Sequence, residues 1–461
     1  MDASVAVVGG GISGLSTAYY LSKAGVSCTL IEARPRLGGV IQSEHVDGCV
    51  VEGGPDSFIS IKPAAMELIA DLGLAGEVIG SNDHLRITYV WKGGRLVPLP
   101  DGLQLMVPTR LMPLLISRLL GWSTKARMAM ELLHPPRRRA EDESVAEFVA
   151  SHYGAEAVDY LAEPLLAGIY GGNPSDLSIT SVLPRFVELE ARYGSLTKGV
   201  LTELKANQAA AKKLPLFRTL KSGLGRLVEV LADRLEGHST VLRSRALAVE
   251  RTGGGFRIRL DGGWLESPQL VLACEAHSAA KLATALDGRL AELLAAVPYS
   301  SSMTVALGFP DRAFPKPLAG FGFLVPKRER RRLVACTWVD TKFSHRAPDG
   351  TTLLRCFLGG ADDAGILSES DDAVVSAVMD ELHEMARFDA PPAFWRIFRW
   401  PRSMAQYTVG HPGRLAEIQA RAAAIPGLQL AGNAYTGIGI PDCIRMGKQA
   451  AESIARASCT V

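Results

Sequence analysis

The 461-residue sequence lacks several features that would exclude or assign whole classes of protein. Its seven cysteines include no C-x-x-C pair, which argues against disulfides or a cysteine-based zinc site and favours reduced thiols in the cytoplasm. The formal net charge is only +2, so no general nucleic-acid-binding surface is indicated. No run of about 18 apolar residues occurs and no signal peptide precedes Val5, so neither a transmembrane helix nor secretion is expected.

Motifs of several enzyme classes are missing as well. None of the nine histidines stands in an H-E-x-x-H or similar spacing, so no metal site is expected. No G-x-S-x-G elbow supports hydrolysis. Gly223 and Gly225 lack a third matching glycine and indicate a turn rather than a second nucleotide site.

One nucleotide-binding pattern is complete, at residues 5–32, VAVVGGGISGLSTAYYLSKAGVSCTLIE. An apolar strand leads into Gly9, Gly11 and Gly14 in G-x-G-x-x-G spacing, and a helix and a second strand ending at Glu32 follow. The glycines allow backbone N–H groups to reach a pyrophosphate at the helix N-terminus, and Glu32 suits a ribose hydroxyl. An ordinary strand-helix-strand turn is the alternative, and the pattern alone does not separate NAD from FAD.

A later glycine pair favours FAD. Flavin reductases of the glutathione reductase type need a second nucleotide site, so its absence favours reoxidation by O2 or a quinone. The segment 33–39, ARPRLGG, places Arg36 where it would approach the pyrophosphate and ends in paired glycines that permit close backbone approach, although a surface turn fits too. The segment 51–58, VEGGPDSF, predicts a tight loop.

The pattern of strands and helices predicts a mixed α/β and α+β fold with three parts. Residues 1–62, 215–285 and 425–461 would assemble a Rossmann-like dinucleotide-binding domain from discontinuous segments. Residues 63–100 and 286–424 would form a sheet-based substrate-binding domain, and 101–214 a helical domain.

The helical part contains a segment, 103–133, that is rich in Leu and Met, includes Trp122 and holds no acid before Glu131. Such a segment fits an interfacial membrane helix, but it equally fits a substrate-channel helix packed on the core. The charged run at 135–143 is interpreted as a solvated linker, with anionic lipid binding as the alternative. The expected location is therefore cytoplasmic, with peripheral membrane contact left open.

Motifs across nearly the whole chain resemble one family. They are EGGPDSF (52–58), GIYGGNPSDLS (168–178), GFGFLVP (320–326), RWPRSMAQYTVGH (399–411) and AGNAYTGIGIPDC (431–443). Together they resemble the oxygen-dependent protoporphyrinogen oxidases, including the coproporphyrinogen-oxidising members, within the flavin-containing amine oxidase superfamily. The resemblance implies a flavin domain similar to p-hydroxybenzoate hydroxylase, a substrate domain and a helical membrane-associated domain.

The resemblance also implies an activity. Protoporphyrinogen IX would be oxidised to protoporphyrin IX by non-covalently bound FAD, with O2 reduced to H2O2, in heme biosynthesis. Because PLPDGLQLMVPT (98–109) is similar to coproporphyrinogen-type members, oxidation of coproporphyrinogen III to coproporphyrin III is the alternative. Ferrochelatase, as the next enzyme of heme synthesis, and a second copy of the chain are the implied protein partners.

Site residues carry over from the resemblance at matching positions. The family often places an arginine for a substrate propionate where Thr88 falls here, with Arg86 and Arg95 on either side, and Arg95 is taken as the candidate propionate partner. The implied FAD contacts are Gly9, Gly10, Gly11, Ile12, Ser13, Gly14, Glu32, Ala33, Arg36, Leu37, Gly38, Gly39, Gly54, Pro55, Asp56, Ser57, Leu247, Asn433, Ile438, Gly439 and Ile440, and the implied substrate contacts are Arg95, Gly168, Gly172, Leu324 and Phe343.

Asp56 is the candidate catalytic residue. It would accept pyrrole hydrogen bonds or guide deprotonation, or instead cap the turn after Pro55. Leu324 and Phe343 would sandwich the macrocycle, but both also fit an ordinary core. His411 is interpreted as structural.

Two other functions fit the flavin motifs. A flavin amine oxidase or a carotenoid-type desaturase would use the same cofactor, and a flavin-binding scaffold or sensor would not turn over at all. Cys443 suggests covalent flavin attachment, although a buried thiol fits its context better.

Overall fold

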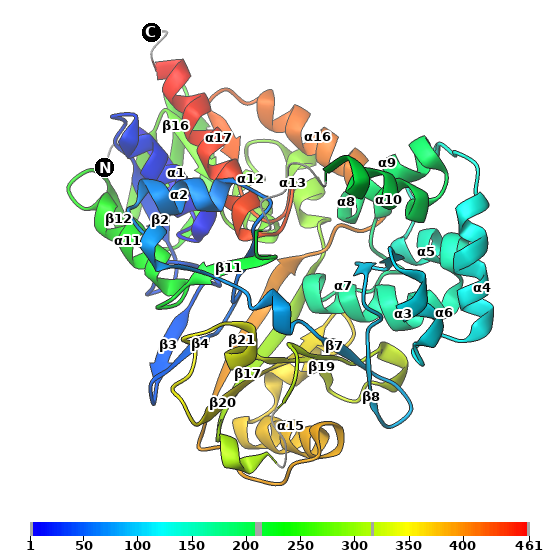
Figure 1. The fold of residues 1–461 in the computed structure, drawn as a ribbon. Coiled ribbons are helices and arrows are strands. Elements are labelled where there is room, and N and C mark those ends of the chain that lie inside the picture. Colours follow the sequence, from blue (N-terminus) through cyan, green and yellow to red (C-terminus); the bar gives the residue numbers. More distant parts are fainter. Residues whose placement is uncertain (1–2, 208–213, 315–317, 459–461) are drawn as a thin grey trace.

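The computed structural model describes residues 3–207, 214–314 and 318–458. The parts of the expected domains at 1–2, 208–213, 315–317 and 459–461 lie outside the described residues. Figure 1 shows a parallel sheet with its helices at the upper left, a second sheet below it and a group of helices at the right.

The parallel sheet contains the nucleotide-binding pattern. Its three central strands, β2 (Thr29–Glu32), β1 (Val5–Val8) and β16 (Gln269–Leu272), are short and almost entirely buried, as is typical of parallel strands in the middle of a sheet. Helices α1 (Ile12–Lys23), α11 (Gly225–Leu235) and α17 (Ile440–Ser458) pack together, with α1 in the middle. The strands, in spatial order, are β12 (Thr240–Arg243), β2 (Thr29–Glu32), β1 (Val5–Val8), β16 (Gln269–Leu272) and β22 (Leu428–Leu430), and all neighbours run parallel.

Smaller elements surround this sheet. Helix α2 (Ala64–Asp71) contacts α17, and strand β6 (Val78–Gly80) pairs with β11 (Phe217–Leu220). Both α2 and β6 were expected in the substrate-binding domain. The elements are β3 (Ser43–Val46) paired with β4 (Cys49–Glu52); β5 (Phe58–Ile59), β11 (Phe217–Leu220) and β6 (Val78–Gly80) in one sheet; β13 (Ala246–Thr252), β14 (Gly255–Leu260) and β15 (Gly263–Ser267) in another; and α2 (Ala64–Asp71), α12 (Ala276–Ala283), α13 (Gly288–Ala295) and α16 (His411–Ala423).

A seven-stranded mixed sheet forms the second body. Helix α15 (Asp371–Ala386) lies below it in Figure 1, and apolar side chains between helix and sheet form a separate core around Phe309, Leu354 and Val378. The strands, in spatial order, are β21 (Phe394–Ala405), β17 (Tyr299–Pro310), β20 (Thr351–Gly360), β19 (Leu333–Trp338), β18 (Gly322–Leu324), β7 (Thr88–Trp91) and β8 (Leu96–Pro98), with α14 (Val339–Lys342) after β19.

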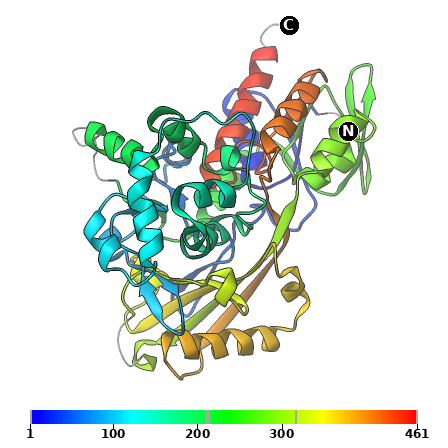
Figure 2. The same cartoon turned by 90° about the vertical axis from the view of Figure 1, so that its right-hand side faces the viewer.

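The third body is helical (Figure 2). Buried polar contacts help to order it, since His152 lies between the carboxylates of Glu131 and Glu190, at 3.2 and 3.3 Å. In the part of the chain that the structure describes, no helix combines the length and apolarity needed to cross a membrane. Its elements are α3 (Leu111–Ile116), α4 (Trp122–Met130), α5 (Val145–Tyr153), α6 (Ala155–Ala157), a π-helical turn (Val158–Ala162), α7 (Glu163–Tyr170), α8 (Ile179–Val182), α9 (Pro184–Tyr193) and α10 (Leu196–Asn207), beside the short pair β9 (Leu103–Gln104) and β10 (Val107–Pro108).

The predicted fold class is confirmed, whereas the membrane association of the helical part stays a prediction. The segment 103–133 has two faces. Leu114, Leu119 and Leu120 are buried, whereas Met112, Ile116 and Trp122 are exposed. Strands β12 and β13, which follow one another in the chain, belong to different sheets.

Candidate functional site

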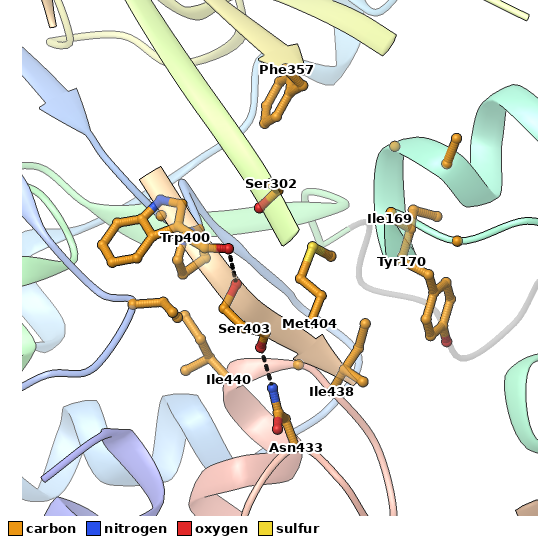
Figure 3. Close-up of a pocket in the computed structure, with 18 of the residues that line it drawn as sticks. Ile169, Tyr170, Ser302, Phe357, Trp400, Ser403, Met404, Asn433, Ile438 and Ile440 are labelled. Atoms are coloured by element: carbon orange, nitrogen blue, oxygen red, sulfur yellow. Dashed lines mark hydrogen bonds between the residues drawn. The ribbon is translucent and has the colours of Figure 1, made fainter. Parts of the chain in front are cut away.

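One large cavity connects the three bodies. Its volume is about 2460 Å³, and its lining includes the glycine loop after β1, strands β18 to β20 and helix α7. Sites for single drug-sized ligands are typically about 300–1,000 Å³, so this cavity has room for more than one such ligand. Figure 3 shows its centre, where β17, β21 and the loop before α17 meet.

The glycine loop is shaped by close backbone packing. Gly9 has a φ of +112°, and a side chain there would approach the Ala273 carbonyl oxygen to 2.7 Å. At Gly14, a Cβ atom would lie 1.8 Å from the carbonyl oxygen of Gly9, so the first turn of α1 can pack on the loop only without a side chain. Gly11 differs, because the nearest atom to an added Cβ, the Cα of Gly39, is 3.9 Å away. Gly11 faces the cavity, whereas Gly9 and Gly14 fix the loop.

Polar groups at this end suit a dinucleotide. The N-terminus of α1 begins after Gly11 without a side-chain cap, which leaves backbone N–H groups for an anion. Glu32 lines the cavity at the end of β2, and its carboxylate accepts hydrogen bonds from the backbone N–H groups of Gly10 (2.6 Å) and Arg34 (2.7 Å). This fixed acid and the free helix terminus fit a ribose followed by a pyrophosphate.

Arg36 has a different position from the one expected. Its guanidinium donates hydrogen bonds to the carbonyl oxygens of Leu37, Gly39 and Ile41, and the side chain does not line the cavity. Burial lowers the pKa of Arg36 despite the nearby Glu32 carboxylate. The predicted contact of Arg36 with a pyrophosphate is therefore corrected, since the arginine holds the glycine turn from behind.

The loop before α17 forms the next wall of the cavity (Figure 3). The Asn433 side chain accepts a hydrogen bond from the Tyr299 hydroxyl (3.1 Å) and donates one to the Ser403 carbonyl oxygen (2.9 Å). The Tyr407 hydroxyl donates to the Asn433 carbonyl oxygen (2.8 Å) and accepts from the Gly437 N–H (2.9 Å). Both polar ends of the Asn433 side chain are thus occupied by protein groups, which leaves Ile438, Gly439 and Ile440 as this loop's main face toward the cavity.

Asp56 is held between two cations. Lys342 Nζ lies 2.8 Å and Arg355 Nη1 3.7 Å from its Oδ2 atom, and the Ser57 hydroxyl donates to Oδ1 at 2.6 Å. Burial alone would raise its pKa, but Lys342 and Arg355 hold the pKa of Asp56 well below its ordinary value. The carboxylate stays ionised and accepts protons weakly, so it suits hydrogen-bond acceptance better than proton abstraction.

Two of the family motifs, one of them the predicted substrate-binding loop at 168–172, meet on the other side of the cavity. Gln406 Nε2, from the QY-x-x-GH motif, donates hydrogen bonds to the Tyr170 carbonyl oxygen (2.7 Å) and the Ser300 hydroxyl (3.0 Å). A Cβ atom at Gly172 would crowd Gln406 Oε1, so a larger residue there would displace the Gln406 side chain from these hydrogen bonds. Gly168 lies beside Leu324, whose Cδ2 atom would be 3.5 Å from an added Cβ. The GIYGG loop is therefore fixed against the sheet at the cavity wall.

Phe343 lies elsewhere. Its side chain is fully buried and borders a separate small void with Val51, Ala306 and Leu353. The predicted stacking of Phe343 on a macrocycle is corrected, because the ring packs in the protein core behind Lys342. Leu324, its expected partner, does line the large cavity.

The remaining predicted residues also divide into those that line the cavity and those that do not. Gly10, Gly14 and Leu37 shape the loop without facing the cavity. The predicted residues that line it are Gly9, Gly11, Ile12, Ser13, Glu32, Ala33, Gly38, Gly39, Gly54, Pro55, Asp56, Ser57, Arg95, Gly168, Gly172, Leu247, Leu324, Asn433, Ile438, Gly439 and Ile440.

Several lining residues had no assigned role in the sequence analysis. Lys342 and Arg355 flank Asp56, and Tyr407 stacks on His411 with ring centroids 4.2 Å apart. The QY-x-x-GH motif was visible in the sequence, but it did not show that its tyrosine joins the cavity wall. No sequence signal connects Lys342 or Arg355 with Asp56. Residues 113–118, from the segment considered for membrane contact, also line the cavity through Pro113, Ile116, Ser117 and Arg118.

The site contains no metal-binding cluster within residues 3–207, 214–314 and 318–458. The Cys443 thiol lines the cavity, and burial raises its pKa to about 11. It is therefore a protonated, weakly nucleophilic thiol at neutral pH.

Comparisons with known proteins agree with this geometry. Residues 12–455 match the family described as flavin containing amine oxidoreductase. A coproporphyrinogen III oxidase of Bacillus subtilis is 35% identical, with 97% of this chain and 96% of the relative covered. Protoporphyrinogen oxidase 1, chloroplastic, of Arabidopsis thaliana is 28% identical, covering 95% and 85%. A crystal structure from Exiguobacterium sp. 255-15 has a TM-score of 0.87 at 32% identity, with 98% of both chains covered.

Proposed function

This chain belongs to the flavin containing amine oxidoreductase family, as its motifs predicted, and we propose that it oxidises a porphyrinogen to the corresponding porphyrin. Coproporphyrinogen III is the proposed first substrate, because the coproporphyrinogen III oxidase of Bacillus subtilis shares 35% of its sequence. Protoporphyrinogen IX is the second candidate, supported by the chloroplast relative. Either reaction serves heme biosynthesis.

The cavity is the observation that carries this proposal. It continues from the glycine loop and Glu32 to an apolar region bordered by Leu324, Ile169 and Phe357, without an intervening wall. A nucleotide-type cofactor at one end would therefore meet a large apolar substrate at the other. A large, mostly apolar tetrapyrrole with polar groups at its edge fits such a site.

We propose FAD as the flavin, bound without a covalent link. The exposed N-terminus of α1 and the Glu32 carboxylate suit the adenosine diphosphate part, which a flavin mononucleotide lacks. The protonated Cys443 thiol supports non-covalent binding. When bound, the flavin supplies the capacity to accept hydride from a carbon centre.

The protein residues then bind, orient and shield the substrate. Conversion of a porphyrinogen to a porphyrin removes six hydrogens, and three O2 molecules accept them as three H2O2. Since aromatisation favours the products, a strong base is unnecessary. Asp56, ionised between Lys342 and Arg355, would accept a hydrogen bond from a pyrrole N–H and so orient the ring.

Anaerobic flavin reduction tests this function. The purified protein, yellow from its flavin, is mixed without oxygen with coproporphyrinogen III, protoporphyrinogen IX, or a primary or polyamine. The proposal expects the flavin absorbance to bleach with a porphyrinogen and not with amines, and fluorescent porphyrin to form in air.

The other functions predict different results. In an amine oxidase, only amines would bleach the flavin. In a desaturase or a flavin-binding sensor, neither the porphyrinogens nor the amines would reduce it. Bleaching with amines but not with either porphyrinogen would reject the proposed function.

A further inference from the structure

The acidic side chains that line the cavity already have partners. Asp56 pairs with Lys342, Asp101 with Arg110, Asp362 with Lys327 and Asp442 with Lys62, at 2.5–2.8 Å between charged atoms. The two remaining acids, at the nucleotide end, are Glu32, which accepts two backbone hydrogen bonds, and Glu275, which lies 3.8 Å from Arg34.

In contrast to these acids, three arginines at the substrate end have no charged partner among the described residues. Arg86, Arg95 and Arg118 are exposed and line the cavity. Among the residues that the structure describes, none of their guanidinium groups has an ion pair or hydrogen bond. Arg330, a fourth cation of this wall, is bonded to Glu163 at 2.6 Å and is therefore neutralised. The substrate end thus carries an excess of positive charge that the protein does not balance.

The three arginines come from separate places in the fold. Arg86 precedes β7 and Arg95 precedes β8, and these strands are antiparallel neighbours. Arg95 lies opposite Lys92, six residues along the chain from Arg86, so the two backbone positions lie at opposite ends of β7, roughly 20 Å apart at about 3.4 Å per residue. Arg118 follows α3, on the helical side. This spacing suits several anionic groups on one large ligand rather than one anion shared by all three.

Apolar groups between them favour a ligand with an apolar centre. Ile87, Leu105 and Ile116 line the same end of the cavity and are 41%, 42% and 76% exposed. Guanidinium groups bind carboxylates with charge-assisted, often paired hydrogen bonds. The matching ligand is a large apolar molecule with carboxylates at its periphery.

We propose that Arg86, Arg95 and Arg118 bind peripheral carboxylates of the substrate and select the porphyrinogen with more of them. This inference rests on the proposed function. Coproporphyrinogen III carries four propionates, whereas protoporphyrinogen IX carries two and has vinyl groups at the other two positions. Thr88 stands at the position where a propionate-binding arginine was expected, and Arg86 and Arg95 flank it in the sequence.

Steady-state kinetics of Arg86→Gln, Arg95→Gln and Arg118→Gln test the inference. At least two variants should raise KM for coproporphyrinogen III by about tenfold, the effect of losing one charge-assisted hydrogen bond, with kcat within twofold. KM for protoporphyrinogen IX should change less, so the ratio of the two kcat/KM values should fall. An unchanged ratio in all three variants would overturn the inference.

Matched variants separate binding from folding. Arg118→Lys keeps the charge and should recover most of the affinity. Arg138→Gln removes another exposed arginine without an ion pair, one that does not line the cavity, and should leave both KM values unchanged. If Arg138→Gln raised KM as much as the cavity variants, a general charge effect would replace the inference.

A binding experiment distinguishes failure of the inference from failure of the proposed function. The flavin-loaded protein is titrated with coproporphyrin III and protoporphyrin IX, followed by porphyrin fluorescence, which requires no turnover. Arginine variants should weaken coproporphyrin III binding more strongly. If the wild type oxidises neither porphyrinogen, the function fails, and this titration still decides the carboxylate preference. Sedimentation with phosphatidylglycerol vesicles provides the competing outcome, since loss of vesicle binding with an unchanged porphyrin preference would assign the arginines to lipid.

Discussion

The two ends of the cavity are built by different kinds of contact. At the nucleotide end, the glycine loop, α1 and Glu32 all belong to residues 5–32, and backbone geometry fixes them. At the substrate end, partners are distant in the chain, as in the pairs Gln406–Tyr170 and Lys342–Asp56. The nucleotide end should therefore respond to backbone crowding, and the substrate end to loss of individual side chains.

Gly14→Val should have the largest effect. Its Cβ would lie 1.8 Å from the Gly9 carbonyl oxygen, so α1 would have to leave the loop. We expect a loss of more than about 4 kcal/mol in the free energy of unfolding, measured by urea denaturation, or no soluble protein.

Gly11→Val is the matched comparison. The space beside Gly11 is open to the cavity, so the protein should fold and yet bind less than a tenth of the normal flavin, measured as flavin absorbance per protein. Normal flavin content in folded Gly11→Val protein would contradict the position assigned to the pyrophosphate.

Phe343→Ala should lower stability by about 3–5 kcal/mol, because the ring is fully buried, while KM stays within twofold. Leu324→Ala should do the reverse, raising KM by the equivalent of about 1–2 kcal/mol with a smaller loss of stability. Urea denaturation measures the loss of stability in both variants, and steady-state kinetics measures the change in KM. A large KM increase for Phe343→Ala would indicate that the ring contacts the substrate after all.

Asp56→Asn should cost about 2 kcal/mol of stability at pH 7, because Lys342 and Arg355 would lose the negative charge that lies between them. As the folded-state pKa of Asp56 is depressed, its contribution is complete above the ordinary value of 3.8 and is lost as the pH falls below it. The difference between wild type and variant should therefore be constant from pH 5 to pH 8. If kcat fell by orders of magnitude while stability was unchanged, Asp56 would be a proton acceptor instead.

His411 should give the smallest effect. Burial lowers its pKa below the ordinary 6.5, so the unfolded chain binds a proton that the folded protein does not. Stability from this group is complete above pH 6.5 and falls with decreasing pH, by at most about 1.4 kcal/mol per pH unit.

His411→Asn should reduce the slope of unfolding free energy against pH between pH 6.5 and 5, whereas the exposed His84→Asn should not. Equal slopes in wild type and His411→Asn would exclude this contribution.

The sequence predicted local features well and distant neighbours poorly. The strand–glycine–helix unit at 5–32 was recognised because apolar runs and glycine spacing are local signals. Arg36 and Phe343 were assigned to the wrong surroundings, since a motif position does not state which way a side chain faces. The segment 103–133 was ambiguous for the same reason, and only packing showed that Pro113 and Arg118 line the cavity.

By itself, the sequence determined the family, the flavin-binding unit and the class of reaction, because these depend on residues that are close together in the chain or form long motifs. The tertiary structure decided which cations face the cavity without a partner and that Asp56 is held between Lys342 and Arg355. Charges act through space and not along the chain, so their balance exists only once the sheets and helices have packed.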